Sequence, residues 1–335
     1  MTHSPALPAP LLLGAALLLA ACAKDNSDKG ADSGQRSADS AAAFDSSSGA
    51  SADAAGGAAR RVAMVEGFKT PESVRFDSAQ NVWFVSNVNG NPSVKDNNGF
   101  ISRVRGDGSA VDSLMFIAGG RNGVTLNAPK GSVLVGDTLV VLDIDAVRMF
   151  NARTGAPVGS VNLAPLGATF LNDIARGPDG ALYITDTGIR FGANGQVTHP
   201  GRDRIFKIAG RTPSVAIADT ALAGPNGIAW DAANNRFVVV PFNSKSLMTW
   251  APGGKPAPLA QGVGQFDGVA VLSDGRVLAS TWADSSIYVA SNGTLTKLAS
   301  GLPGPADFGV NASGDVLAVP LFTENRVEFW SIGGR

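Results

Sequence analysis

Short apolar runs recur along the chain from about residue 62 to its C-terminal end, and many of them alternate with polar residues. Gly, Asp, Asn or Pro stands at the ends of most runs. This combination is typical of β-strands that are joined by tight turns. After residue 61 no stretch shows the 3.6-residue periodicity of an amphipathic helix, so a parallel α/β fold is not expected. The pattern predicts an all-β domain.

The clearest apolar run opens after a turn at six places, which are Val82, Thr138, Ala181, Arg236, Arg276 and Asp315. Successive starts are 56, 43, 55, 40 and 39 residues apart. The two long intervals contain turn-rich insertions at 87–99 and 188–202. A base period of about 40 residues is that of one four-stranded propeller blade. We therefore predict a six-bladed β-propeller of four-stranded antiparallel blades over residues 62–335. Pairing of a strand at 62–66 with the last blade would close the ring and remove a free sheet edge.

The first 61 residues differ in composition from the rest. Residues 11–21 form an apolar run that is too short to cross about 30 Å of hydrocarbon as a helix, and it matches a signal-peptide core. The run ends in Leu-Ala-Ala-Cys at 19–22, which resembles the lipobox of bacterial lipoproteins. That resemblance implies cleavage after residue 21 and acylation of Cys22. An unmodified cysteine in an ordinary signal peptide is the alternative, and the first ten residues lack the usual Lys or Arg.

Residues 22–61 are mostly Ala, Ser, Asp and Gly, so we expect a flexible, lipid-anchored linker. We predict that the protein is an exported bacterial lipoprotein, anchored by its lipid on the periplasmic side or at the outer membrane. The lipid would be its only contact with the membrane. We expect a monomer.

The charge balance narrows the possible partners. The net charge is −1 with 16% charged residues, and no basic stripe is available for the phosphates of nucleic acid. A nucleic-acid partner is therefore not expected. The chain has one cysteine, so no intramolecular disulfide can form.

One polar residue stands near the start of each predicted inner strand, about eight to ten positions before the apolar run. Because the inner strands of a propeller line its channel, these residues should converge at one end of the channel. The six are Glu72, Lys130, Asn172, Asn226, Asp267 and Asp307. Two carboxylates and two amides among them supply oxygen ligands that suit Ca²⁺ better than Mg²⁺. The alternative is that Asn and Asp only cap backbone groups at strand starts.

These motifs resemble those of the regucalcin (senescence marker protein)/gluconolactonase family. The matching segments are Glu72, FLNDIA with PDGALYITDTG, GPNGIAW and FDGVAVLSDGRV, within residues 66–331. The resemblance to diisopropylfluorophosphatase and the paraoxonases is more distant. It implies that Glu72, Asn172, Asn226 and Asp267 hold a calcium or other divalent ion at the channel mouth. A paraoxonase-type histidine pair is not expected, because His199 is the only histidine after the predicted signal peptide.

We therefore expect a calcium-dependent hydrolase of a small lactone or related ester. The metal would polarise the carbonyl, and Asp267 would act as general base towards a metal-bound water or as a nucleophile. The alternative is a non-catalytic, NHL-like binding propeller whose metal is structural.

Other polar residues receive weaker predictions. Lys130 would either bind an anionic group of the substrate or form a salt bridge with Asp307, and the salt bridge is the favoured interpretation. Asp307 is also a candidate outer ligand of the metal or a hydrogen-bond partner of neighbouring strand starts. Asp186 and Asn243 are candidate substrate-binding residues or turn residues, and His199 is expected to be a loop residue. The five tryptophans, Trp83, Trp230, Trp250, Trp282 and Trp330, are expected to pack between blades.

Overall fold

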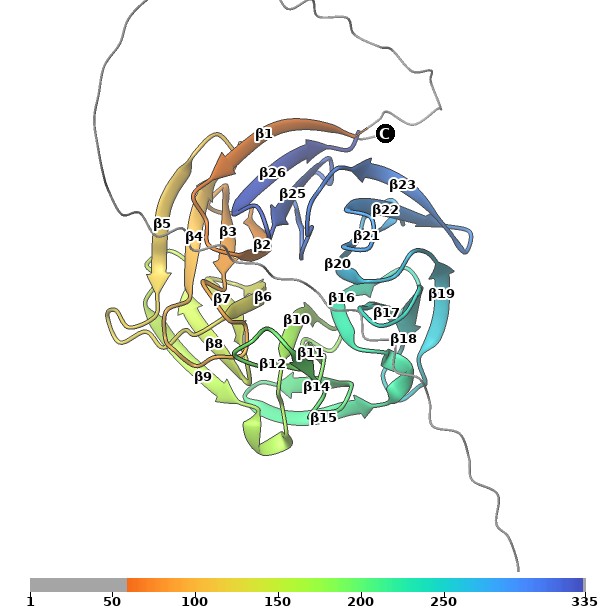
Figure 1. Cartoon of the computed structure of the whole chain (residues 1–335), viewed down its shortest axis with the longest axis horizontal. Coiled ribbons are helices and arrows are strands. Elements are labelled where there is room, and N and C mark those ends of the chain that lie inside the picture. The colour runs from red at the N-terminus through yellow and green to blue at the C-terminus, as the bar shows by residue number, and fades with distance from the viewer. Residues whose placement is uncertain (1–58, 334–335) are drawn as a thin grey trace, which may run out of the picture. The chain divides into compact units, whose positions relative to one another are not determined.

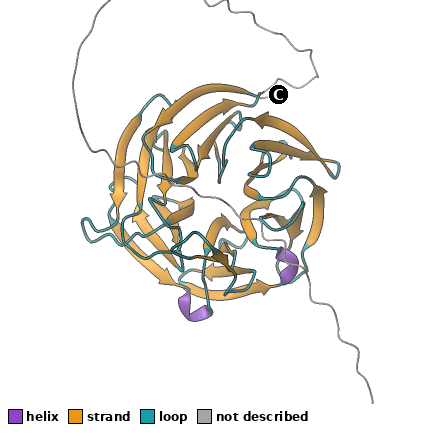
Figure 2. Ribbon diagram, in the orientation of Figure 1, coloured by secondary structure: helices purple, strands orange, loops and turns teal. Residues whose placement is uncertain are grey.

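A computed structural model of the chain describes residues 59–333. The predicted signal peptide, Cys22 and nearly all of the predicted linker lie outside the described residues. Within them, secondary structure consists of β-strands and two short 3₁₀ helices, η1 (Ala164–Leu166) and η2 (Thr220–Leu222) (Figure 2). None of the described helices has the length and apolar character needed to span a bilayer. The all-β prediction is confirmed.

The strands group into antiparallel sheets that follow chain order. The first sheet contains β2 (Pro71–Asp77), β3 (Val82–Asn87), β4 (Phe100–Arg105) and β5 (Val111–Ala118). The second contains β6 (Pro129–Val135), β7 (Thr138–Asp143), β8 (Ala146–Asn151) and β9 (Pro157–Asn162). The third contains β10 (Leu171–Arg176), β11 (Leu182–Asp186), β14 (Arg204–Ala209) and β15 (Thr212–Ala218).

The next sheet has eight strands in the order β16-β17-β18-β19-β23-β22-β21-β20. Its first half is β16 (Pro225–Asp231), β17 (Arg236–Pro241), β18 (Ser246–Trp250) and β19 (Ala257–Gln261). Its second half is β20 (Phe266–Val271), β21 (Val277–Thr281), β22 (Ser286–Ser291) and β23 (Thr294–Ser300). The last sheet joins β24 (Gly309–Val310), β25 (Val316–Leu321), β26 (Arg326–Ser331) and β1 (Arg60–Glu66).

The sheets stand around a common centre in a propeller-like ring, with β2, β6, β10, β16 and β20 innermost and β5, β9, β15, β19 and β23 outermost (Figure 1). Strand β1 lies antiparallel to β26, so the first strand of the described chain completes the last sheet. This pairing confirms the predicted contact between the two ends of the domain. It covers the edge of β26, which would otherwise be open to strand addition.

The apolar core lies between neighbouring sheets rather than in one central mass. One cluster joins β7 and β8 to β10, β11 and β14 through Val140, Leu142, Ile174, Ile184 and Phe206. Equivalent clusters fill the other contacts, including the contact of the first and last sheets around Trp83 and Phe329. Because both faces of each sheet are packed, the middle strands are almost continuously apolar, as in the buried FVVVP of β17.

Five inner strands, β2, β6, β10, β16 and β20, each have one extra residue near the start. In β16, Pro225 pairs with Pro241 and Ile228 pairs with Val239, so three steps on the inner strand match two on its partner. The same irregularity occurs in β2, β6, β10 and β20. Such β-bulges turn side chains away from the regular alternation of a strand. They therefore decide which residues face the channel.

Small residues allow the inner strands to approach one another at these bulges. A Cβ atom at Gly227 would collide with the carbonyl oxygen of Asp267 on the next inner strand. A Cβ at Gly131 would meet the backbone of Asp173, and one at Gly268 would meet that of Asp307. Glycine at these positions allows neighbouring inner strands to approach closely, which brings their polar starts near one another.

The two predicted insertions contact each other. The second contains a hairpin of β12 (Arg190–Phe191) and β13 (Val197–Thr198). Asn91 in the first insertion donates to the carbonyl of Gly192 at 3.2 Å, and the Phe191 N–H donates to Ser93 Oγ at 3.0 Å. The insertions belong to the first and third sheets, so their contact bridges the second sheet.

Candidate functional site

The structure places five of the six predicted ring residues at the second position of an inner strand, inside the bulge. These are Glu72 in β2, Lys130 in β6, Asn172 in β10, Asn226 in β16 and Asp267 in β20. Asp307 precedes β24, between the Pro305–Leu321 bridge and Gly309. All six side chains are buried. The polar strand starts therefore form one buried group at one end of the channel.

Three carboxylates of this group, Glu72, Asp267 and Asp307, each have one buried oxygen without a protein partner. Glu72 Oε2 and Asp267 Oδ1 are buried and accept no hydrogen bond, although Asp267 Oδ2 accepts one from the Trp282 indole N–H at 2.8 Å. Burial, and then the negative charge of Asp307, raise the pKa of Asp267 to about 8. Burial and the charges of Asp267 and Asp307 raise the pKa of Glu72 well above its usual value. The positive charge of Lys130 acts in the opposite direction at Glu72.

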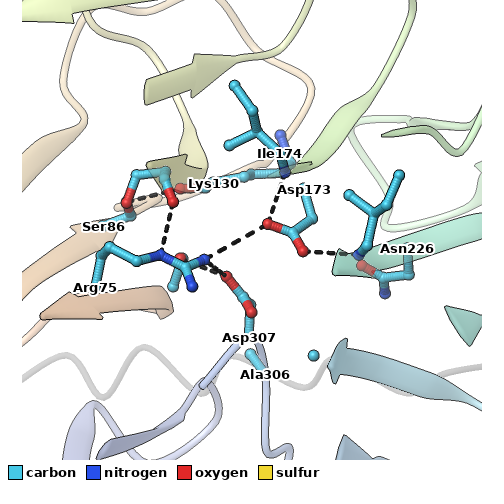
Figure 3. A network of polar contacts seen from close by, with 12 residues as sticks. Arg75, Ser86, Lys130, Asp173, Ile174, Asn226, Ala306 and Asp307 are labelled. Carbon is cyan, nitrogen blue, oxygen red and sulfur yellow. Dashed lines mark hydrogen bonds and ion pairs between the residues drawn. The ribbon is translucent and has the colours of Figure 1, made fainter. Parts of the chain in front are cut away.

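A second layer of charge lies beside these carboxylates. Arg75 Nη2 is 3.1 Å from Asp307 Oδ2 and 3.7 Å from Asp173 Oδ1, and Arg75 Nε donates to the Ser132 carbonyl at 2.7 Å (Figure 3). Asp307 also accepts the Ser73 hydroxyl at 2.6 Å. The cation paired with Asp307 is thus Arg75 and not Lys130, so the salt bridge favoured from the sequence is wrong.

Arg75 and Asp173 were missed by sequence reasoning. Asp173 directly follows Asn172, and in a regular strand neighbouring side chains point to opposite faces. The bulge in β10 breaks this alternation. Asp173 consequently reaches Arg75 on one side and accepts the Ile228 N–H at 2.8 Å on the other (Figure 3). The one sequence signal was a charged residue next to the apolar positions of each inner strand, Arg75 in PESVRFD and Asp173 in LNDIAR.

Lys130 occupies a closed environment. Its Nζ lies 4.1 Å from the centre of the Phe170 ring and is within hydrogen-bond distance of the carbonyls of Pro92 and Ala128, at 3.3 and 3.4 Å. Burial lowers the pKa of Lys130 to about 8, while the charges of Glu72, Asp143 and Asp186 act in the opposite direction. The first insertion covers Lys130 through Pro92, so this ammonium balances internal charge.

The two amide side chains are oriented by protein acceptors. Asn172 Nδ2 donates to Thr187 Oγ1 at 2.9 Å, and Asn226 Nδ2 faces the Phe266 carbonyl at 3.4 Å. Fixing the NH₂ group in this way leaves the carbonyl oxygen of each amide for a cation or ligand. Thr187 in turn donates to the Pro225 carbonyl at 2.8 Å, which links the starts of β10 and β16.

The remaining candidates lie in different surroundings. Asp186 is fully buried and accepts the backbone N–H groups of Phe170 and Gly188, at 2.8 and 3.2 Å, so it secures the chain entering β10. Asn243 is exposed beyond the end of β17. His199 is 2.9 Å from Asp203 in the second insertion, as expected for a loop residue.

The chemistry of the donor set bears on which ion could bind at the site. No group of three or more His, Cys, Asp or Glu side chains in the described part of the chain has the arrangement of a metal site. The predicted set contains only two carboxylates, with two amides completing it. The unpartnered oxygens of Glu72 and Asp267 are what a hard cation would satisfy, and carboxylate and amide oxygens are its preferred ligands. The residues present therefore fit a divalent cation.

Solved structures share this fold. A candidate gluconolactonase superposes with a TM-score of 0.57 at 19% identity, covering 83% of this chain and 92% of that chain. The gluconolactonase of Xanthomonas campestris superposes with a TM-score of 0.59 at 16% sequence identity, and the match covers 80% of this chain and 88% of that chain. The calcium-binding protein regucalcin of Agrobacterium tumefaciens superposes with a TM-score of 0.59 at 15% sequence identity, and the match covers 82% of this chain and 96% of that chain. No protein-family model and no curated protein matches the chain. The resemblance inferred from the motifs is confirmed at the level of fold: the chain is similar to gluconolactonase and regucalcin structures.

Proposed function

We propose that the protein is a divalent-metal-dependent hydrolase of a small lactone or related ester, with its site at the channel end formed by the inner-strand starts. The observation that carries the proposal is a charge imbalance. Four buried carboxylates, Glu72, Asp173, Asp267 and Asp307, share the site with two cations, Arg75 and Lys130. Fully ionised, these groups have a formal charge of −2 (four negative and two positive). One divalent cation would neutralise it.

The residues that would hold the cation are Glu72, Asn172, Asn226 and Asp267. Calcium is favoured because it accepts six to eight oxygen ligands in flexible geometry, whereas Mg²⁺ requires a strict octahedron. When bound, the cation would supply Lewis-acid polarisation of the substrate carbonyl. The solved gluconolactonases and the calcium-binding regucalcin of the same fold support this choice of chemistry and of ion.

Asp267 is the residue assigned to the chemical step. Its Oδ2 is held by the Trp282 indole, which leaves Oδ1 to accept a proton from water or to attack the carbonyl carbon. As a base, Asp267 would take a proton from the water whose oxygen bonds to the carbonyl carbon. As a nucleophile, it would bond to this carbon itself, and water would then hydrolyse the resulting anhydride. In both routes the ring carbon–oxygen bond breaks. The leaving ring oxygen takes one proton of the water and becomes a hydroxyl group. The other proton is released, because the carboxylic acid that forms is ionised at neutral pH.

We also propose that the ring has six blades. Within the described residues there are 26 strands, and β12 and β13 form a separate hairpin inside the second insertion. The other 24 strands fall into six groups of four. The two halves of the eight-stranded sheet share only the single bridge between Gln261 and Thr294, and a core cluster of Val238, Val240, Val269 and Ala279 lies between them. This arrangement is that of two blades touching at their outer strands.

The test of the hydrolase combines metal binding with turnover. Calcium bound to the purified protein is measured by calorimetry, and a panel of lactones is assayed with and without a chelator. We expect binding of one ion and turnover that the chelator abolishes. Glu72→Gln should weaken calcium binding, and Asp267→Asn should lower kcat by about 10²–10⁴-fold in a folded protein.

Asp137→Asn is the matched control, because this carboxylate is 68% exposed and pairs with Arg153 at the surface. It should leave both calcium binding and kcat unchanged. Calcium binding without turnover of any lactone would contradict the hydrolase and favour a binding propeller with a structural metal. A protein that binds no divalent ion would contradict both.

A further inference from the structure

A set of mostly apolar residues stands above the polar strand starts. The second strand of each blade ends where the inner strand begins, as the pairing of Phe266 with Thr281 shows. The residue that directly follows each second strand is therefore at the same end of the channel as the site. These residues are Val88, Ile144, Thr187, Phe242, Trp282 and Phe322. Thr187 is the only one of the six whose side chain contains an oxygen atom.

Three consecutive members of this set form an aromatic wall, defined here as Phe242, Trp282 and Phe322. The Phe242 and Trp282 ring centres are 6.4 Å apart, and those of Trp282 and Phe322 are 5.6 Å apart. All three side chains are only partly buried. Phe322 also packs against the apolar cluster of Val88, Ala128 and Ile144. The wall thus continues from blade four to blade six and meets apolar residues of the first two blades.

The wall is attached directly to the site. The Trp282 indole N–H donates to Asp267 Oδ2 at 2.8 Å, so the ring edge of Trp282 touches the carboxylate assigned to the chemical step. The ring contacts of Trp282 with Phe242 and Phe322 agree with the predicted packing between blades, and the hydrogen bond to Asp267 gives Trp282 a role in the site as well. Since the indole N–H is the wall's only polar side-chain group, the wall has no further donor or acceptor for a ligand.

This composition distinguishes between classes of lactone. A polyhydroxylated sugar lactone placed against the wall would lose water from its hydroxyl groups without gaining hydrogen bonds in return. An alkyl or aryl substituent would instead bury apolar area against three aromatic rings. Lys130, which could otherwise bind a hydroxyl or carboxylate group, is 1% exposed beneath Pro92.

We propose that the substrate is a lactone bearing an alkyl or aryl substituent, and that Phe242, Trp282 and Phe322 select it over polyhydroxylated lactones. This inference rests on the proposed hydrolase function. The substituent of the lactone would pack against the aromatic wall, and its carbonyl group would lie at Asp267. Phe242 and Phe322 are specificity residues, because neither contacts the reacting atoms. Trp282 has two roles, since it also orients Asp267.

The experiment compares lactones that share a six-membered ring. kcat/KM is measured for δ-decanolactone, δ-valerolactone, dihydrocoumarin and glucono-1,5-lactone. We expect the alkyl-substituted lactone to exceed the unsubstituted one by at least about tenfold, and dihydrocoumarin to exceed the gluconolactone. Phe242→Asn and Phe322→Asn should each reduce the ratio of δ-decanolactone to δ-valerolactone by about fivefold or more.

Phe116→Asn is the matched control, because Phe116 is a partly buried aromatic residue on the outer strand β5, where it stacks on Phe84. It should leave the ratio unchanged. A preference for glucono-1,5-lactone, or ratios that neither wall variant alters, would overturn the inference while leaving the hydrolase in place.

If none of the four lactones were hydrolysed, the proposed hydrolase function would be overturned. A binding measurement would then test whether the aromatic wall still prefers a ligand with an alkyl substituent. The probe is 6-pentylpiperidin-2-one, a lactam that matches δ-decanolactone and resists hydrolysis. We expect it to quench tryptophan fluorescence in the wild type but not in Trp282→Phe, with weaker binding in Phe242→Asn. Absence of this quenching in the wild type would overturn the inference as well.

Discussion

At the scale of single residues, the site depends on carboxyl groups that the fold holds in unfavourable surroundings. Asp267 has an unpartnered oxygen, and its pKa is raised to about 8 by burial and by the charge of Asp307. Asp307 and Asp173 share the guanidinium of Arg75 and still have raised pKa values, chiefly because they are buried. Such groups oppose folding when they are ionised, unless a cation binds beside them.

A pH dependence of stability follows for the metal-free protein. Because the pKa of Asp267 rises from 3.8 to about 8 on folding, the folded state retains a proton that the unfolded chain releases. Stability should therefore be greatest at low pH and fall as pH rises from about 4 towards about 8. Glu72 acts in the same direction, because its pKa is also raised.

The measurement is the Tm in chelator at several pH values between 5 and 8. Asp267→Asn should flatten the decline, because the amide does not titrate. Saturating calcium should also flatten it, since the ion compensates the ionised carboxylates. A metal-free Tm that rises over this interval would contradict the assignment of raised pKa values.

At the scale of elements, the bulges and the glycines beside them bring the site residues together. Gly227 is the clearest case, because any Cβ atom there would collide with the Asp267 carbonyl oxygen on β20. We expect Gly227→Ala to force β16 and β20 apart and to lower the free energy of unfolding by about 2 kcal/mol or more.

The change is measured by urea unfolding, and calcium affinity should decrease with it because Asn226 and Asp267 are displaced. Gly254→Ala is the control, since its Cβ would meet only the Ala251 carbonyl at 3.2 Å in a surface turn. Equal losses in the two variants would show that the spacing of the inner strands does not matter.

At the scale of the whole molecule, we expect stability to depend on closure of the ring by β1. β1 pairs with β26 along its length, and Val65 belongs to the cluster between the last and first sheets. We expect removal of residues 1–66 to lower the Tm by about 5 °C or more and to cause self-association through the open edge of β26.

A chain that begins at residue 59 retains β1 and provides the comparison. Thermal unfolding and light scattering on the two forms measure the effect. If both forms were monomeric with the same Tm, closure by β1 would contribute nothing to stability.

The sequence by itself determined the repeat, the strand-rich architecture, the pairing of 62–66 with the last strand, and the positions of the polar strand starts. These follow from local patterns, namely turn residues, alternation and spacing, which each segment carries independently of the others. The same patterns identified Glu72, Asn172, Asn226 and Asp267 as one set, because repeats place equivalent residues at equivalent positions.

Only the tertiary structure decided which charges meet. Arg75 and not Lys130 pairs with Asp307, Asp173 joins the site, and Trp282 binds Asp267. These contacts depend on bulges that change the direction of side chains. They also depend on the contact between the insertions of the first and third sheets, which bridges the second sheet. A bulge has no strong sequence signal, and contacts between residues hundreds of positions apart, such as Ser73 and Asp307, depend on how the sheets are placed around the ring. The identity of the site residues was thus local information, whereas their electrostatic partners were not.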